Sequence, residues 1–263
     1  MEFGAFKNRV LTSFHLDLNS YKEKQLKRRL DSYLSRLKMA NYGELFNRMT
    51  ANRVSYEEFL DYLTINVSEF FRDPQRFSDL QKEHLPELIN SRNSVKIWSA
   101  ACSNGSEPYS LAIIMEELGL SGRSKIIATD IDRQILNKAE RATYSKESLK
   151  NVSAARLERF FSQAGTSYAL KEALRRKVTF RHHDLLSGEY DNNYDLILCR
   201  NVTIYFTKEA QEVIYRRFNN SLTNGGLLFI GGSEMIFNYK ELGFEKLSTC
   251  FYRKSAPHNK PKI

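Results

Sequence analysis

The stretch KIWSAACSNGSEPYSLAIIMEELG, residues 96–119, decides the fold. It reads as an apolar strand, a loop of small residues and a helix, which is the layout of a nucleotide-cofactor site in an α/β protein. A dinucleotide fingerprint places three glycines in such a loop, whereas this loop holds a single one, Gly105. The stretch therefore predicts a cofactor turn without a phosphate cradle.

The chain around this stretch alternates short β-rich runs with helical patterns. The runs are VKIWSA, KIIATD, VTFRHH, YDLILCR and GLLFIGG, and helical patterns cover 110–118, 133–142 and 208–222. Strands that alternate with helices indicate βαβ units and a parallel sheet. The run FEKLSTCFYRK, residues 244–254, predicts an additional antiparallel strand at the edge of that sheet.

The chain before residue 95 is helical in pattern. Ser55-Tyr56-Glu57-Glu58 is typical of a capping box, and residues 75–89, after Asp73-Pro74, predict a further helix. Apolar residues recur at helical spacing at Phe3, Phe6, Val10 and Phe14, and again at Leu26, Leu30, Tyr33, Leu34 and Leu37. We therefore expect an all-α domain at 1–72, a linker helix at 73–94 and an α/β domain at 95–254.

Two segments do not fit the alternation. In 159–180, Gly165 could be the turn of a small β-hairpin, and a helix over 168–176 fits the pattern about equally well. The polar, proline-bearing end, 255–263, is expected to be disordered.

The composition limits the class of protein. A net charge of +9 indicates an anionic partner, and nucleic acid and an acidic protein surface fit this charge equally well. No apolar run approaches the roughly 18 residues of a membrane span, and the first residues do not read as a signal peptide. Cys102, Cys199 and Cys250 are widely spaced, so we expect a reduced cytoplasmic protein without membrane insertion.

S-adenosylmethionine is a ligand that suits the loop, because it has a ribose diol, an amino-acid tail and a sulfonium but no phosphate. Ala100, Ala101 and Ser103 are small enough to let such a ligand approach. Glu107 could accept a hydrogen bond from the ligand's ammonium group. The loop alone is weak evidence, because many strand–loop–helix joints hold small residues for packing reasons.

The ends of the following strands carry polar residues that fit the same ligand. Asp130 ends the second strand about 25 residues after Gly105, where an acid grips a ribose diol. Asp132 is the alternative, but it is better placed to cap the next helix. Asp184 follows the third strand and could accept from adenine's amino group, and Asn201 follows the fourth.

Three further residues have simpler explanations than catalysis. His182 and His183 lack Cys or carboxylate partners at ligand spacing, so we interpret them as strand-end or surface residues and expect no metal site. Cys199 lies inside an apolar run, so we interpret it as an inert core residue rather than a nucleophile.

Five motifs occur in order along the chain: INVSEFFRD (65–73), IWSAACSNGSEPYSLA (97–112), ATDID (128–132), HDLL (183–186) and CRNVTIYF (199–206). In these motifs the chain resembles the CheR-type family of chemotaxis receptor methyltransferases over nearly its whole length. The resemblance implies a bacterial protein-glutamate O-methyltransferase that uses S-adenosylmethionine and yields glutamate 5-O-methyl esters and S-adenosylhomocysteine. It also implies a Rossmann-like methyltransferase domain with a small inserted β-hairpin subdomain, at about 159–183, after an all-α N-terminal domain.

The resemblance assigns site residues and a partner. The cofactor contacts that it implies are Asn66, Ser68, Arg72, Ala101, Glu107, Asp130, Asp184, Leu185, Asn201 and Val202. Arg72 and Tyr205 are the residues implied nearest the reacting centre. The implied partner is the cytoplasmic helical domain of methyl-accepting chemotaxis receptors. We expect the protein to bind it as a monomer.

The chain departs from the family pattern at several positions. Position 184 is often Asn and position 68 often Thr, but Asp184 keeps an acceptor and Ser68 keeps a hydroxyl. The turn AGTS, residues 164–167, lacks the longer glycine-rich insertion of members that bind a receptor's C-terminal peptide. Tethering by such a peptide is therefore not expected.

Basic side chains in the all-α region could bind the receptor. Lys22, Arg29 and Arg36 recur every seven residues along one flank of the apolar stripe. They could contact an acidic receptor helix, and a solvated face that only keeps the helix soluble explains them equally well.

Two other functions remain as alternatives. An RNA methyltransferase would suit the positive charge, but the chain lacks the proline-rich motif and the basic–aromatic interleaving of such enzymes. An adaptor that binds the cofactor as a sensor would differ from an enzyme in lacking turnover.

Overall fold

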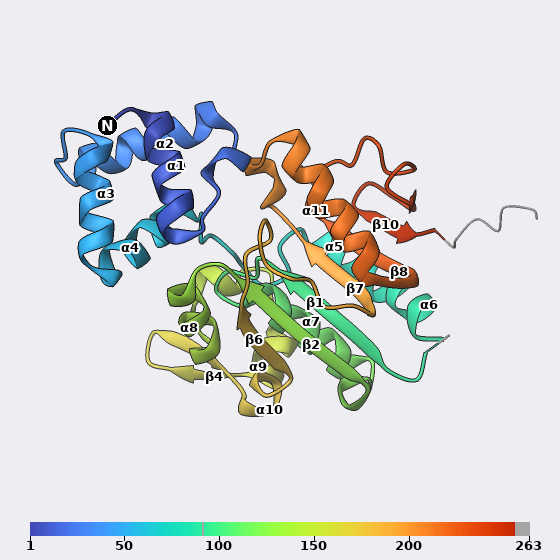
Figure 1. Ribbon diagram of the computed structural model, residues 1–263. Helices are drawn as coiled ribbons and strands as arrows, with labels where there is room; N and C mark the ends of the chain where they lie inside the picture. The colour runs from blue at the N-terminus through green and yellow to red at the C-terminus, as the bar shows by residue number, and fades with distance from the viewer. Residues whose placement is uncertain (91, 256–263) are drawn as a thin grey trace, which may run out of the picture.

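The protein, seen in a computed structural model that describes residues 1–90 and 92–255, has two domains joined by a linker (Figure 1). Helices of the first domain enclose an apolar core of their own around Phe6, Leu30 and Phe59. Two further apolar clusters lie in the second domain. The tail predicted to be disordered lies outside the described residues, apart from Ser255. None of the described helices combines the length and the apolar character needed to cross a membrane.

The first domain is all-α, as predicted. It consists of α1 (Phe3–Phe14), η1 (Leu18–Ser20), α2 (Glu23–Arg36), α3 (Tyr42–Ala51) and α4 (Arg53–Leu63). The capping box predicted at Ser55 is wrong, because Ser55 lies buried inside α4. The cap is Asn52, whose side chain accepts a hydrogen bond from the Val54 N–H at 2.8 Å. Helix α3 was not predicted from the sequence, although the side chain of Asn41 caps it in the same way.

The predicted linker helix is present but irregular. It runs as α5 (Pro74–Asp79), the π-helical turn η2 (Leu80–His84) and α6 (Leu85–Asn90). Pro74 occupies the first helical position, where the absent N–H has no partner to lose. Pro86 cannot donate to the turn before it, and the wider π-turn accommodates this loss. Phe77 and Leu80 pack into an apolar cluster of the second domain, so this helix belongs structurally to that domain.

The second domain is built on a seven-stranded sheet with strand order β6-β2-β1-β7-β8-β10-β9. The strands are β1 (Val95–Ala100), β2 (Ser124–Asp130), β6 (Val178–His182), β7 (Tyr194–Cys199), β8 (Leu222–Ile230), β9 (Phe244–Lys246) and β10 (Phe251–Lys254). The five strands from β6 to β8 are parallel, as predicted. The run 244–254 is antiparallel and reaches the edge of the sheet, as predicted, but it forms two strands instead of one: β10 pairs with β8, and β9 is the edge strand.

Apolar layers cover both faces of this sheet, because side chains alternate along each strand. Ile97 and Leu198 join the cluster that contains residues of α5, α6 and α7, whereas Trp98 and Ile197 join the cluster that contains residues of α11. The helices after β1 are α7 (Ser106–Glu117), η3 (Ser121–Arg123), α8 (Arg133–Arg141), η4 (Glu147–Leu149), α9 (Ala154–Phe160), α10 (Glu172–Arg175), η5 (Thr203–Tyr205) and α11 (Lys208–Ser221). The predicted Rossmann-like α/β class is confirmed.

A small antiparallel sheet is inserted between α8 and β6. Its order is β3-β5-β4, with bounds β3 (Thr143–Ser145), β4 (Phe161–Ala164) and β5 (Ser167–Leu170). The hairpin interpretation of this segment is therefore confirmed, and the competing helix is reduced to α10. Val178–His182 pairs with β2, so the antiparallel strands of the insertion end at Leu170 and the expected range to 183 includes a strand of the main sheet.

Candidate functional site

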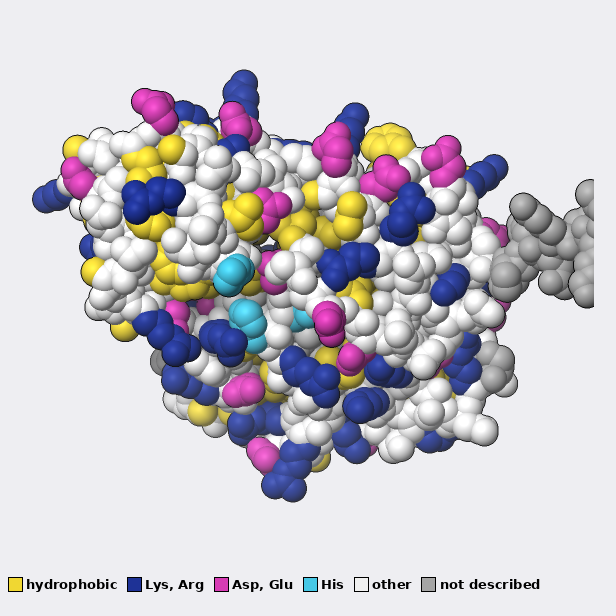
Figure 2. Space-filling view, viewed as in Figure 1, with side chains coloured by type: hydrophobic (Ala, Val, Ile, Leu, Met, Phe, Trp, Pro, Cys, Tyr) yellow, Lys and Arg dark blue, Asp and Glu magenta, His cyan; other side chains and the backbone are white. Residues whose placement is uncertain are grey.

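A cavity of about 610 Å³ lies between the two domains, at the carboxyl ends of β1, β2, β6 and β7. β1 has β2 on one side and β7 on the other, and this reversal of strand order is where open parallel sheets bind ligands. Residues of α2 line the cavity from the other side, together with residues 64–69 and 72 of the segment that joins α4 to α5, which we call the linker from here on. Figure 2 shows the hollow between the domains, with hydrophobic side chains beside it and histidines below it.

The structure brings together every side chain that the resemblance assigned to the cofactor or the reaction. The lining residues include Asn66, Ser68, Arg72, Ala101, Glu107, Asp130, Asp184, Leu185, Asn201, Val202 and Tyr205. Arg29, one of the predicted docking residues, also lines the cavity. Lys22 and Arg36 are not among the described lining residues.

The loop after β1 takes its shape largely from non-glycine residues. Ala101 and Ser103 have φ angles of 60° and 51°, in the left-handed region, and Gly105 has a φ of 83°. The Ser103 N–H donates to the Asp130 carboxylate at 2.8 Å, which holds the loop against the end of β2. A Cβ at Gly105 would lie 2.9 Å from the Cβ of Ala139, so the single glycine allows α8 to pack closely.

Asp130 ends β2 with a buried carboxylate. One oxygen accepts from the Ser103 N–H, and the other accepts from the Asp132 N–H at 3.0 Å. Burial raises the pKa of Asp130 to about 6, although these N–H groups oppose the rise. Each carboxylate oxygen can accept a second hydrogen bond, so both remain able to bind a ribose diol. Asp132 caps α8, as predicted, by accepting from the N–H of Gln134.

Cofactor affinity is expected to fall as the pH drops through 6. The ionised form of Asp130 accepts most strongly from a diol, and a carboxyl with a pKa of about 6 is roughly 10% ionised at pH 5. Calorimetry with S-adenosylhomocysteine should therefore show that protonation of Asp130 lowers the affinity about tenfold between pH 8 and pH 5. Burial also raises the pKa of Glu107, which adds to the loss. The Asp130→Asn variant should not show the tenfold loss of affinity that is due to protonation of Asp130. A variant profile as steep as the parent's would contradict the assignment.

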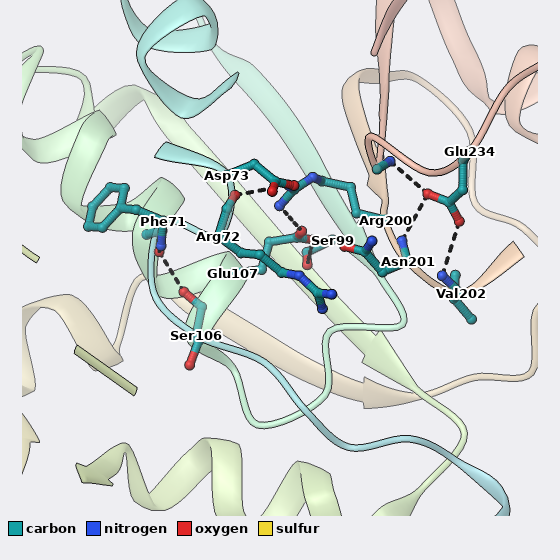
Figure 3. Close-up of polar contacts among 12 residues, drawn as sticks. Phe71, Arg72, Asp73, Ser99, Ser106, Glu107, Arg200, Asn201, Val202 and Glu234 are labelled. Atoms are coloured by element: carbon teal, nitrogen blue, oxygen red, sulfur yellow. Dashed lines mark hydrogen bonds and ion pairs between the residues drawn. The ribbon is translucent and has the colours of Figure 1, made fainter. Parts of the chain in front are cut away.

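Arg200, directly after β7, connects the linker to the first turn of α7 (Figure 3). Its Nη1 donates to the Glu107 carboxylate at 3.3 Å. Its Nη2 donates to the Asp73 carboxylate at 2.6 Å and to the main-chain carbonyl of Arg72 at 2.9 Å. The Arg200 side chain is 2% exposed, and its guanidinium lies over the ring of Phe77. The linker position of Arg72 is therefore fixed by a buried cation of the sheet.

Glu107 is buried in the first turn of α7. Its carboxylate accepts from the Ser99 hydroxyl at 2.8 Å as well as from Arg200. Burial raises the pKa of Glu107, and the positive charge of Arg200 opposes the rise. Arg200 therefore favours the ionised form of Glu107, which is the form that would bind an ammonium group.

Glu234, in the loop after β8, fixes the main chain of the loop after β7 (Figure 3). One carboxylate oxygen accepts from the N–H groups of Asn201 at 2.8 Å and Gly231 at 2.6 Å. The other accepts from the N–H of Val202 at 3.0 Å and from the N–H and hydroxyl of Thr203 at 2.8 and 2.7 Å. Asn201 has a φ of 59°, so the Glu234 carboxylate holds an uncommon backbone conformation at the site.

Neither Arg200 nor Glu234 was predicted as a site residue from the sequence. Arg200 follows the apolar run of β7 directly, and Glu234 lies four residues after the last residue of β8. That position in a buried sheet is a signal for an internal partner, because a charge in such a place must be paired or hydrogen-bonded.

The linker residues are held by hydrogen bonds to the α/β domain and within the linker itself. The Asn66 amide donates to the Asp132 carboxylate at 2.8 Å, so it joins the linker to the start of α8. The main-chain carbonyl of Ser68 accepts from the Asn104 amide at 3.4 Å. Arg72 is half-buried, and its guanidinium donates to a linker carbonyl at 3.3 Å. These contacts place the predicted linker residues at the cavity without closing it.

The residues after β6 form a turn at the cavity wall. Asp184 accepts from the Leu186 N–H and the Ser187 hydroxyl, both at 2.8 Å, and Leu185 is buried. The ring of His183 packs edge-on against Trp98 at 5.4 Å. Burial lowers the pKa of His183, which favours its neutral form.

The remaining candidates for reactive chemistry are structural. Cys199 is fully buried in an apolar cluster, and burial raises the pKa of its thiol well above the usual value. The interpretation of this residue as core is confirmed. Over residues 1–90 and 92–255, no three His, Cys, Asp or Glu side chains are grouped in a way that could hold a metal ion.

The predicted docking residues lie on or near α2. Arg29 is half-buried, and its guanidinium donates to the main-chain carbonyl of Tyr62, which ties α2 to α4. Arg36 is exposed, and its guanidinium lies 4.7 Å from the centre of the Tyr62 ring. Lys22 precedes α2, and its N–H donates to the carbonyl of Tyr205 at 2.9 Å.

The site fits S-adenosylmethionine on three structural grounds. Asp130 and Glu107 present buried carboxylates to the cavity, one suited to a diol and the other to an ammonium group. The loop between them contains a single glycine and does not form the three-glycine turn that a pyrophosphate needs. A volume of about 610 Å³ lies within the usual range for a cofactor pocket.

Comparison with known proteins gives matches over nearly the whole chain. The family model described as "CheR methyltransferase, all-alpha domain" matches residues 1–64, and "CheR methyltransferase, SAM binding domain" matches residues 66–251. The chain is 41% identical to a chemotaxis protein methyltransferase of Listeria monocytogenes, over 97% of each chain. It is 36% identical to chemotaxis protein methyltransferase 1 of Pseudomonas aeruginosa, over 90% of this chain and 91% of that one. It is also 36% identical to the chemotaxis protein methyltransferase of Salmonella typhimurium, over 84% of this chain and 79% of that one.

Proposed function

Because the chain belongs to the CheR methyltransferase family, we propose that it methylates glutamate side chains of chemotaxis receptors. The chain is an S-adenosylmethionine-dependent methyltransferase of chemotaxis. The receptor, the glutamate acceptor and the glutamate 5-O-methyl ester product are the proposal. The observation that carries it is the cavity at the ends of β1, β2, β6 and β7, which all the assigned cofactor and reaction residues line.

A glutamate acceptor needs little chemistry from the enzyme. Its carboxylate has an ordinary pKa of about 4.3, so at neutral pH it is already a nucleophile. Displacement at a sulfonium methyl requires an in-line approach to within about 3–3.5 Å and the exclusion of water, but no base. Among the described lining residues, His183 is the one histidine, and its ring packs edge-on against both Trp98 and Tyr190. The cavity is thus suited to orient an anion rather than to remove a proton.

Each assigned residue has a proposed role toward the cofactor, which supplies the methyl group when bound. Glu107 binds its ammonium group, Asp130 its ribose diol, Asp184 and Leu185 its adenine, and Arg72 its carboxylate. Asn66, Ser68, Ala101, Asn201 and Val202 complete the walls of the site. Tyr205 would orient the acceptor beside the methyl group of the bound cofactor. An arginine too close to the acceptor would weaken its nucleophilicity, which favours the carboxylate role for Arg72.

The proposed partner is the cytoplasmic helical domain of methyl-accepting chemotaxis receptors, bound by a monomer in the cytoplasm. The all-α domain supports this proposal, because α2 contributes to the cavity wall and carries exposed basic residues. The β4–β5 hairpin turns through the short segment Gly165-Thr166, which supports an enzyme without tethering by a receptor peptide.

Incubation of the full chain with methyl-labelled S-adenosylmethionine and receptor-rich membranes tests the proposal. We expect label in receptor protein, released as methanol by mild base, because methyl esters are base-labile. Label that stays in RNA would support the nucleic-acid alternative. Cofactor binding without transfer to any fraction would support the sensor alternative.

The basic flank of α2 gives a prediction for receptor binding. Arg36→Glu should weaken receptor binding about three- to tenfold at low salt, because it reverses an exposed charge that faces an acidic partner. The difference should shrink as salt is raised. Surface plasmon resonance with a receptor cytoplasmic fragment measures both effects. Lys208→Glu, on the exposed start of α11, serves as the control of equal charge change. Equal loss in both variants would show that net charge alone is responsible.

A further inference from the structure

Tyr21 belongs to the all-α domain but lines the cavity of the α/β domain. Its main chain forms an antiparallel bridge with Phe206. The bridge is flanked by two hydrogen bonds, from the Lys22 N–H to the Tyr205 carbonyl at 2.9 Å and from the Thr207 N–H to the Ser20 carbonyl at 2.8 Å. The backbone of Tyr21 is therefore fixed beside the loop that carries Tyr205.

The side chain of Tyr21 is fixed as well. Its ring packs edge-on against Phe206, with ring centres 4.9 Å apart. It also packs against the apolar core of the all-α domain and against the apolar cluster around Trp98. The ring is thus held by both domains, and its hydroxyl extends from a rigid base.

The hydroxyl of Tyr21 has no hydrogen-bond partner among the described residues, although the side chain is partly buried. Burial raises the pKa of this hydroxyl, and the negative charges of Asp184 and Asp130 raise it further. The hydroxyl therefore stays protonated and lies within the field of the two acids at the ends of β2 and β6. Tyr21 lines the cavity and its hydroxyl is not bonded to any described residue, so the hydroxyl is available to a ligand that occupies the cavity.

We propose that Tyr21 is a cofactor-binding residue, whose hydroxyl hydrogen-bonds the adenosine half of S-adenosylmethionine between Asp130 and Asp184. The inference rests on the proposed assignment of these acids to ribose and adenine. Adenosine offers both hydroxyl groups and ring nitrogens, so a phenol that donates and accepts can bind either. Under this proposal the all-α domain completes the cofactor site as well as binding the protein substrate.

The Tyr21→Phe variant of the full chain tests the proposal, because it keeps the ring and the main-chain bridge and removes one oxygen. Calorimetry with S-adenosylhomocysteine should show a five- to tenfold loss of affinity. 5′-Methylthioadenosine, which shares the adenosine half but lacks the amino-acid tail, should show the same loss. The midpoint of thermal unfolding without ligand should stay at the parental value.

Tyr56→Phe is the matched control. Tyr56 is another partly buried tyrosine of the all-α domain whose hydroxyl feels the charge of Asp184, but it is not among the lining residues of the cavity. Its variant should bind both ligands with parental affinity.

Parental affinity in Tyr21→Phe, equal losses in both variants, or a loss confined to S-adenosylhomocysteine would each overturn the proposal. The proposal of a glutamate acceptor is tested separately, because neither S-adenosylhomocysteine nor 5′-methylthioadenosine contains the acceptor. If the parent binds both ligands but labels no receptor, the proposed function fails while the Tyr21 assignment is still decided by the affinities.

Discussion

Replacing Glu234 with alanine is expected to lower the free energy of unfolding by about 4 kcal/mol or more and to abolish tight cofactor binding. Glu234 is 5% exposed, and its carboxylate accepts from four N–H groups and one hydroxyl. Each buried donor left without an acceptor costs about 1–3 kcal/mol. Asn201 would also lose the contact that holds its left-handed conformation, so the cofactor-facing loop after β7 would no longer be fixed.

Urea denaturation and calorimetry with S-adenosylhomocysteine measure the two losses. The Glu234→Gln variant retains one acceptor oxygen but turns an amide donor toward N–H groups, so we expect an intermediate loss of stability. If Glu234→Ala does not fold, this variant carries the test. Glu241→Ala, in the same loop region but exposed, should change neither quantity. Parental affinity in Glu234→Gln would show that the carboxylate does not position the site.

The second large effect is expected at Arg200. Arg200→Ala should lower the free energy of unfolding by about 3–5 kcal/mol, because it leaves the buried Glu107 carboxylate without its cation. It also removes the hydrogen bond that holds the main chain of Arg72, so we expect cofactor affinity to fall about 100-fold. Denaturant unfolding and calorimetry give the two values.

Arg200→Lys separates charge from geometry. Lysine keeps the positive charge beside Glu107 but cannot bridge the Glu107 carboxylate, the Asp73 carboxylate and a carbonyl at once. We expect it to recover most of the stability but little of the cofactor affinity. Arg216→Ala, on the exposed surface of α11, removes an exposed ion pair and should cost no more than about 1 kcal/mol. Full recovery of affinity in Arg200→Lys would leave Arg200 with a purely electrostatic role.

The parts of the fold that the sequence predicted are those that local periodicity controls. Ile97 and Trp98 lie in one of several apolar runs that alternate with helical patterns. This alternation strongly favours a parallel sheet covered by helices on both faces. The candidate cofactor residues Asp130 and Asn201 were predicted by the same logic, because they lie at the carboxyl ends of strands that meet at one edge of the sheet. The candidates in the linker, Asn66, Ser68 and Arg72, came from the family resemblance and not from the pattern of strands.

The parts that the sequence could not predict depend on contacts between distant segments. β10 lies between β8 and β9 because of pairing that no local pattern records. Glu234 fixes Asn201 from the far end of another strand, and Arg200 reaches back to Asp73 in the linker. The cap of α4 was placed wrongly because Ser55 has the right residue type, while Asn52 has the extended backbone that a cap needs.

The paired main chains of Ser20–Lys22 and Tyr205–Thr207 limit how the two domains can be recombined. Main-chain pairing depends on strand direction and spacing rather than on side-chain identity, so a transplanted helical module must reproduce the local backbone path and not merely the residue types. Chimaeras that exchange the all-α domain between homologous enzymes should therefore take both of these paired segments from the same parent. A chimaera joined only at the linker would pair the Ser20–Lys22 segment of one parent with the Tyr205–Thr207 segment of the other.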